Sequence, residues 1–126
     1  MIVMSRLLRD HPEINVNWAI EHQMTPLHTA SCNGHDEVVK LLLAHPMIQV
    51  NVKSGDGGTP LCLGCWKGRV SVIRLLLKDP RVDATLHDHR GCTSLWNASS
   101  EGHHEVIEWL IASGRDLGDV KKGNRP

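Results

Sequence analysis

Thr59-Pro60-Leu61-Cys62 stands near the middle of the chain, and the same pattern occurs twice more. It is found earlier as Thr-Pro-Leu-His at residues 25–28 and later as Thr-Ser-Leu-Trp at residues 93–96. Because 59 − 25 and 93 − 59 are both 34, the three copies lie in one register. A constant period of this length is typical of a solenoid built from stacked units.

Glycine, valine and leucine positions keep the same period through whole units. They are Gly34, Gly68 and Gly102, then Val38, Val72 and Val106, and finally Leu42, Leu76 and Leu110. A His11-Pro12 pair precedes the first copy, as His45-Pro46 and Asp79-Pro80 precede the next two, which indicates a leading partial unit. We therefore expect one domain over residues 1–126. It would hold a partial unit at 1–24, units at about 25–58, 59–92 and 93–117, and a polar tail at 118–126.

Each unit has the sequence of two helices followed by an extended segment. Thr59 can cap a helix whose first residue is Pro60, and Gly68 can end that helix. A second helix carries Val72, Ile73 and three consecutive leucines, an apolar surface broad enough to be buried on both sides. The predicted helix pairs are 26–33 with 37–44, 60–67 with 71–78, and 94–101 with 105–112. The partial unit would add an outer helix at residues 2–9, which makes the fold all-α.

These residues resemble ankyrin repeats. The resemblance rests on the Thr-Pro-Leu-His start, the pairs Gly34-His35 and Gly102-His103, the Val-Val-x-Leu-Leu run at residues 38–42 and the lead-in from Asp56 to Thr59. It covers nearly all of residues 6–117. The resemblance implies an ankyrin repeat α-solenoid of helix-turn-helix units with extended β-turn fingers, and a protein-binding scaffold rather than an enzyme.

Two departures from the family pattern predict local weaknesses. The family's histidine, which links neighbouring units by hydrogen bonds, is kept as His28 but replaced by Cys62 and Trp96, so we expect weaker links after the first unit. Gln23 stands where Gly57 and Gly91 mark the turn of the finger. The first finger is therefore expected to be distorted.

The composition argues against several classes of function. Fourteen basic residues balance 14 acidic residues among 126, so nothing favours nucleic acid or an anionic membrane as a partner. No apolar run approaches the roughly 20 residues of a membrane span. The four irregularly spaced cysteines suit free thiols. We expect an intracellular, cytoplasmic protein.

No catalytic residue, cofactor or metal site is expected. Cys62 and Cys65 could present two sulfurs on one helical face, but a second such pair is missing, so small core residues are the favoured interpretation. The histidines invite a metal interpretation, above all His87, His89, His103 and His104. The first two lie on a finger, however, and the last two on a helix of the next unit, which are separate elements. Structural roles are expected for most histidines.

The resemblance places the partner site on the concave side, along fingers and inner-helix ends. The predicted partner-binding residues are Glu21, His22, Met24, Cys32, Asn33, Asp56, Trp66, Lys67, His89, Arg90, Ser100 and Glu101, and Gly55, Gly58 and Cys92 are also expected to be exposed. Trp66 has the composition of a binding hot spot, although its ring could instead close over the core. The alternative function is a structural or oligomerising segment of a larger protein that self-associates through uncapped ends.

Overall fold

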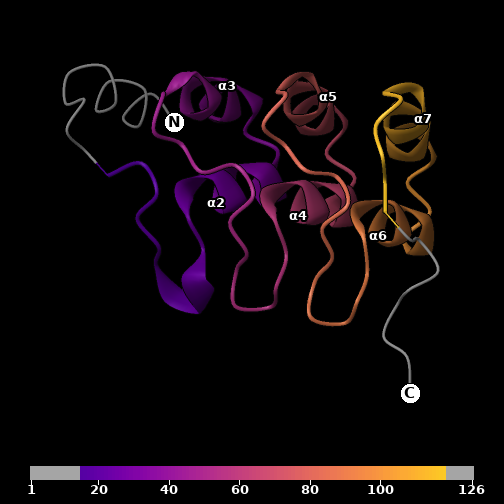
Figure 1. Cartoon of the computed structure of the whole chain (residues 1–126), viewed down its shortest axis with the longest axis horizontal. Helices are drawn as coiled ribbons and strands as arrows, with labels where there is room; N and C mark the ends of the chain where they lie inside the picture. Colours follow the sequence, from indigo (N-terminus) through magenta and orange to yellow (C-terminus); the bar gives the residue numbers. More distant parts are fainter. Residues whose placement is uncertain (1–14, 119–126) are drawn as a thin grey trace.

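The structure, a computed structural model, describes residues 15–118, which form a solenoid of three stacked units (Figure 1). The inner helices are α2 (Pro26–Asn33), α4 (Pro60–Lys67) and α6 (Ser94–Ser100), and the outer helices are α3 (Asp36–Ala44), α5 (Val70–Lys78) and α7 (His104–Ala112). A short 3-10 helix, η1, spans Glu21–Gln23. All six predicted helices begin and end within one residue of the expected positions. The expected helix at residues 2–9 lies outside the described residues.

The helices form two rows. Inner helices α2, α4 and α6 lie side by side in one row and outer helices α3, α5 and α7 in the other (Figure 1). A loop that turns back on itself extends from the inner row before each inner helix, and these three loops are the fingers. In the structure, one unit is a finger with the inner helix and the outer helix that follow it. In the third finger, His87 and Thr93 form an antiparallel bridge. The all-α solenoid expected from the repeat is confirmed.

A threonine starts each inner helix. The side chains of Thr25, Thr59 and Thr93 accept hydrogen bonds from the backbone N–H three residues later, at 3.4, 3.2 and 3.2 Å. Each bond satisfies one of the amide groups that the first turn of a helix leaves without a partner. The repeated tetrapeptide therefore fixes where each unit begins.

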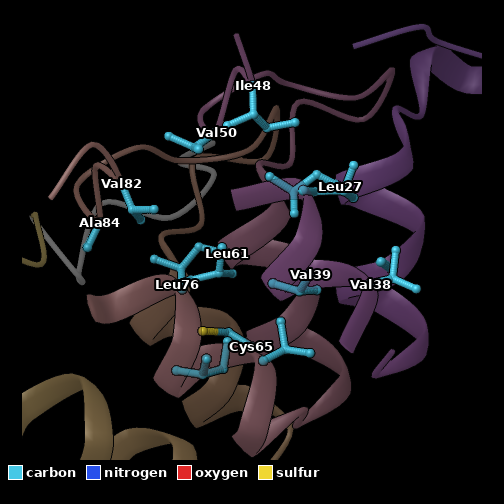
Figure 2. Packing of buried hydrophobic residues seen from close by; sticks show 14 of the residues in the cluster. Leu27, Val38, Val39, Ile48, Val50, Leu61, Cys65, Leu76, Val82 and Ala84 are labelled. Carbon is cyan, nitrogen blue, oxygen red and sulfur yellow. The ribbon is translucent and has the colours of Figure 1, made fainter. Parts of the chain in front are cut away.

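Leucine, valine and isoleucine side chains form one continuous core between the two rows (Figure 2). Leu42, Leu76 and Leu110 are fully buried at equivalent positions of the three outer helices. Side chains of the loops between units, among them Ile48 and Val82, cover one side of this core. Because each unit buries its apolar surface against its neighbours, no unit has a separate core.

Polar side chains also join neighbouring units at intervals of one repeat. The Asn17 side chain bonds Met47 O and Gln49 N at 2.9 and 2.8 Å, and Asn51 bonds Arg81 O and Asp83 N at the same distances. The guanidinium of Arg81 donates to Leu43 O, and that of Arg115 donates to Leu77 O. Each loop is therefore held by side chains of an adjacent unit.

The ends of two inner helices are bonded by the next unit. Arg69 Nε donates to Cys32 O at 2.9 Å, and His103 Nε2 donates to Trp66 O at 2.9 Å. These carbonyls lie in the last turn of α2 and α4, where carbonyl groups have no hydrogen-bond donor within the helix. A cationic or donor side chain is favourable at such an end.

The first finger is distorted, as predicted. His22 and Gln23 have φ values of 61° and 58°, in the left-handed region that favours glycine. Gly57, which stands at the position of Gln23 in the second finger, has a φ of 83°. Two non-glycine residues of the first finger therefore adopt a backbone conformation that is unfavourable for residues with a Cβ atom.

Candidate functional site

A hollow of about 380 Å³ lies between the second and third fingers and the inner helices, and we call it the central hollow. The fingers contribute Asp56, Gly58, Asp88, His89 and Arg90 to its wall. The two fingers are joined beside it by a hydrogen bond from His89 N to Asp56 O at 3.0 Å. A pair of connected fingers thus forms one side of a concave site.

The helical side of the central hollow is built by α4 and α6. Cys62, Leu63 and Trp66 come from three positions of α4, and Asn97 comes from α6. Cys62 is buried, whereas the Trp66 side chain remains 43% exposed. The ring therefore lines the hollow instead of closing over the core.

Trp66 has fixed neighbours. Lys67 Nζ lies 4.7 Å from the centroid of the Trp66 ring, a distance at which a cation is attracted to the face of an indole. The backbone carbonyl of Trp66 accepts the bond from His103 described above. A ring on an anchored helix end, with a cation beside it, offers a rigid apolar surface with a charged edge.

Asp88 shapes the third finger and positions Arg90. Asp88 Oδ1 accepts hydrogen bonds from the backbone N–H of Arg90 at 2.9 Å and of Cys92 at 3.0 Å. Asp88 Oδ2 lies 3.4 Å from the Arg90 guanidinium, which also lies 3.3 Å from Asn97 Oδ1. Since these acceptors hold one nitrogen of an otherwise exposed side chain, Arg90 still offers donors to a ligand.

The structure brings four of the predicted partner-binding residues together, namely Asp56, Trp66, His89 and Arg90. The remaining eight lie outside the central hollow: Glu21, His22, Asn33, Lys67, Ser100 and Glu101 are exposed, and Met24 and Cys32 are half-buried. The expectation of exposure is wrong for Gly58 and Cys92, which are both buried. Gly58 O accepts from the His28 ring and Cys92 N donates to Asp88, so both face inward at the base of a finger.

Sequence reasoning missed Asp88, Asn97, Leu63 and Cys62 as wall residues, and it placed Cys62 in the core. Asp88 had a usable signal, because an aspartate three residues before a turn glycine, here Gly91, often accepts from the turn's backbone. Asn97 and Leu63 had no such signal. They occupy the same position of successive repeats, where the first repeat has Thr29, so the residue type at this position is not constant. Only the packing of fingers on helices shows that this position faces the hollow.

The cysteines are small buried or half-buried side chains, and all four are free thiols. Burial, and next the proximity of Cys62, raise the pKa of the Cys65 thiol well above its usual value. Burial and the neighbouring Asp88 raise the pKa of Cys92. Within residues 15–118 no three His, Cys, Asp or Glu side chains gather in a way that could hold a metal ion.

Comparison with known families agrees with this architecture. A model describing three ankyrin repeats matches residues 2–88 and again residues 48–121. The chain belongs to the ankyrin repeat family. Ankyrin repeats are generally protein–protein interaction modules and typically have no enzymatic activity. A search of curated proteins found no match. Across the described part of this ankyrin chain, none of the helices has the length and apolar character needed to cross a membrane.

Proposed function

We propose that the concave face of this ankyrin repeat chain binds a partner protein, with the central hollow as the middle of the site. The observation that carries the proposal is the half-exposed Trp66 ring at the wall of the hollow. Tryptophan and arginine dominate binding energy at protein interfaces when they lie centrally and are desolvated on binding. Trp66 and Arg90 are the two such residues at this wall.

The charges around the hollow favour a partner segment of mixed character. Trp66 offers apolar area, Arg90 and Lys67 offer cationic donors, and Asp56 offers a carboxylate on the facing finger. We infer a segment that places an apolar side chain on the indole, with an acidic group toward Arg90 and a donor toward Asp56. This arrangement matches the pattern of an apolar interface core inside a polar rim.

The remaining predicted residues extend this site along the concave side. We propose Glu21, His22, Met24, Cys32 and Asn33 for the first unit, Asp56, Trp66 and Lys67 for the second, and His89, Arg90, Ser100 and Glu101 for the third. The four free thiols support a reducing, intracellular compartment, and we propose a cytoplasmic location.

The test compares proteins captured by three immobilised forms of the chain. The forms are the wild type, a Trp66→Ala, Arg90→Ala double variant and Trp109→Ala, which truncates a tryptophan of outer helix α7. We expect a partner that is retained by the wild type and by Trp109→Ala and lost from the double variant. Titration of the purified partner should then show a loss of roughly 2 kcal/mol or more for Trp66→Ala.

Circular dichroism of each variant checks that the helices remain. A partner that binds the wild type and the double variant with equal affinity would remove the central hollow from the site. Loss of binding with Trp109→Ala alone would move the site to the outer helices.

A further inference from the structure

Outer helices α5 and α7 carry opposite charges on their exposed sides. Helix α5 has two cationic side chains, Arg74 and Lys78, and no acidic one, and both are exposed. Helix α7 has two acidic side chains, Glu105 and Glu108, and neither lysine nor arginine, and both are again exposed. Within residues 15–118, none of these four side chains is in an ion pair. A cationic row therefore lies beside an acidic row on the outer surface.

An aromatic ring lies at the boundary between these two helices. The Trp109 side chain of α7 is 38% exposed, and the guanidinium of Arg74 lies 4.7 Å from the centroid of its ring. Leu75 of α5 stands at the repeat position of Trp109, and it is half-buried. Tryptophan and arginine are the residue types that contribute most binding energy at the centre of interfaces. The two charged rows thus enclose a centre of the composition that interfaces bury.

The exposure of these positions does not come from their place near the end of the array. Leu41 stands at the position of Trp109 in the first unit, which is followed by a second unit, and it is still 37% exposed. In the same unit Lys40, at the position of Glu108, is exposed too. Arg74 is exposed in the second unit, although the third unit follows it. A further unit beside α7 would therefore leave this outer surface open.

The repeat determines how this surface can meet a second copy of itself. Because one repeat maps α5 onto α7, the two helices lie side by side and run in the same direction (Figure 1). A two-fold axis parallel to them and midway between them places α5 of each copy over α7 of the other. Positions one repeat apart then lie level, so Arg74 faces Glu108 and Leu75 faces Trp109 of the second copy. Both contacts occur twice, as a two-fold interface requires.

The flanking positions are compatible with the same arrangement. Ser71 faces Glu105, whose carboxylate can accept from the hydroxyl, and Lys78 faces the small Ala112. No two like charges meet. A two-fold axis perpendicular to the helices would instead place α5 on α5, which brings Arg74 and Lys78 of the two copies together. The repulsion of like charges disfavours that alternative.

We propose that this chain forms a two-fold dimer through the outer sides of α5 and α7, with Arg74 paired to Glu108 and Leu75 to Trp109 across the interface. The observation that carries the proposal is the cationic helix beside the acidic one, a surface complementary to itself. The fingers and the outer helices lie on opposite sides of the inner row, so the dimer leaves the central hollow open (Figure 1). The proposal is therefore independent of the proposed partner-binding function.

Sedimentation of the full chain from micromolar to millimolar concentration tests the dimer. We expect the weight-average mass of the wild type to rise toward that of two chains, and added salt to weaken the association because it screens exposed charges. Arg74→Glu with Lys78→Glu should weaken the dimer roughly tenfold or more, since acidic side chains then meet acidic ones. Lys53→Glu with Lys67→Glu is the matched control. It changes the net charge equally at exposed positions outside α5 and α7 and should leave the dimer unchanged.

The opposite charge reversal provides a mixing experiment. Glu105→Lys with Glu108→Lys should disrupt self-association too, because cationic side chains then meet cationic ones. An equimolar mixture of the α5-reversed and α7-reversed chains should associate, since each reversed helix then faces one of opposite charge. A chain that carries all four substitutions should dimerise again for the same reason. Circular dichroism of each variant checks that the helices remain.

Three results would overturn the proposal. The first is a wild type that stays monomeric at millimolar concentration. The second is a dimer that survives both charge reversals, and the third is a failure of association to return in the mixture and in the chain with four substitutions. Trp109→Ala tests the apolar contact and should weaken the dimer roughly tenfold or more. An unchanged dimer in that variant would overturn the pairing of Leu75 with Trp109.

Discussion

Cys62 occupies in the second unit the position that His28 occupies in the first, and the two side chains reach equivalent carbonyl groups at different distances. His28 Nε2 lies 2.7 Å from Val52 O and 3.1 Å from Gly58 O, whereas Cys62 Sγ lies 3.8 Å from Leu86 O. A thiol is a weak donor, and the Cys62 thiol reaches one carbonyl where the His28 imidazole reaches two. These distances agree with the expectation of a weaker link after the first unit.

The first prediction compares truncations at these two positions. His28→Ala should lower the free energy of unfolding by roughly 2–4 kcal/mol, because it leaves the Val52 carbonyl and the Thr25 amide without partners and removes one of the two bonds to Gly58 O. Cys62→Ala should cost about 1 kcal/mol, since it removes two weak sulfur hydrogen bonds, one to Leu86 O and one from Ser94 Oγ, and little volume. Urea unfolding followed by circular dichroism measures both values, and equal losses would refute the idea that the two links differ in strength.

The second prediction concerns pH. Thr25 N–H donates to His28 Nδ1, so Nε2 carries the proton that bonds Val52 O and Gly58 O, and the folded ring is neutral. Burial lowers the pKa of His28 below 6.5, against the opposing effect of the two carbonyl bonds. The unfolded chain therefore takes up a proton at a higher pH than the folded chain.

It follows that the contribution of His28 to stability is complete above pH 6.5 and falls as the pH drops below that value toward the folded pKa. The loss approaches about 1.4 kcal/mol per pH unit between the two pKa values. Urea unfolding of the wild type and of His28→Gln at neutral and mildly acidic pH checks the effect. An identical pH dependence in the two proteins would assign it to other histidines.

The third prediction uses two glycines that share a backbone conformation. Gly68 and Gly102 both have a φ of 72°, but a Cβ on Gly68 would lie 2.6 Å from the His103 ring, while a Cβ on Gly102 would have no atom within 4 Å. Gly102→Ala should cost about 1 kcal/mol for the left-handed backbone alone. Gly68→Ala should cost at least about 1 kcal/mol more, because His103 must move away from Trp66 O. Thermal unfolding measures the difference, which vanishes if the His103 bond contributes nothing.

The fourth prediction concerns the strained first finger. Gln23→Gly should raise the free energy of unfolding by roughly 0.5–1 kcal/mol, because glycine adopts the φ of 58° without a Cβ clash. Glu21→Gly is the control in the same finger and should lower stability, since Glu21 lacks a positive φ and glycine only adds freedom to the unfolded chain. A stabilising effect of both substitutions would indicate that general loosening of the finger is favourable.

The helices could be predicted because periodic residues determine them directly. Thr59 caps α4, Gly68 ends it, and Leu76 marks the buried side of α5, all from local chemistry that repeats every 34 residues. The orientation of Trp66 could not be predicted in this way. Whether its ring lines a hollow or covers the core depends on the packing of the third finger against α4, a contact between different units.

Some hydrogen bonds between units could have been predicted from the sequence, because the residues that make them recur with the period of the repeat. Asn17 and Asn51 are one period apart, as are Arg81 and Arg115, and each pair makes the same contact in successive units. Periodic polar residues in loops are as informative as periodic leucines in helices. The exchange of His103 for Arg69 at one position hides a third link, because the common property is a side-chain nitrogen donor and not the residue type.

The constant spacing of these links makes neighbouring units interchangeable. If residues 59–92 were excised, His28 would keep its contacts with the Val52 and Gly58 carbonyls, and His103 would face the Cys32 carbonyl to which Arg69 now donates. The shortened chain would keep a complete set of complementary contacts at its new junction. Deletion or duplication of a whole repeat can thus change the length of such a chain while the contacts between neighbouring units are preserved.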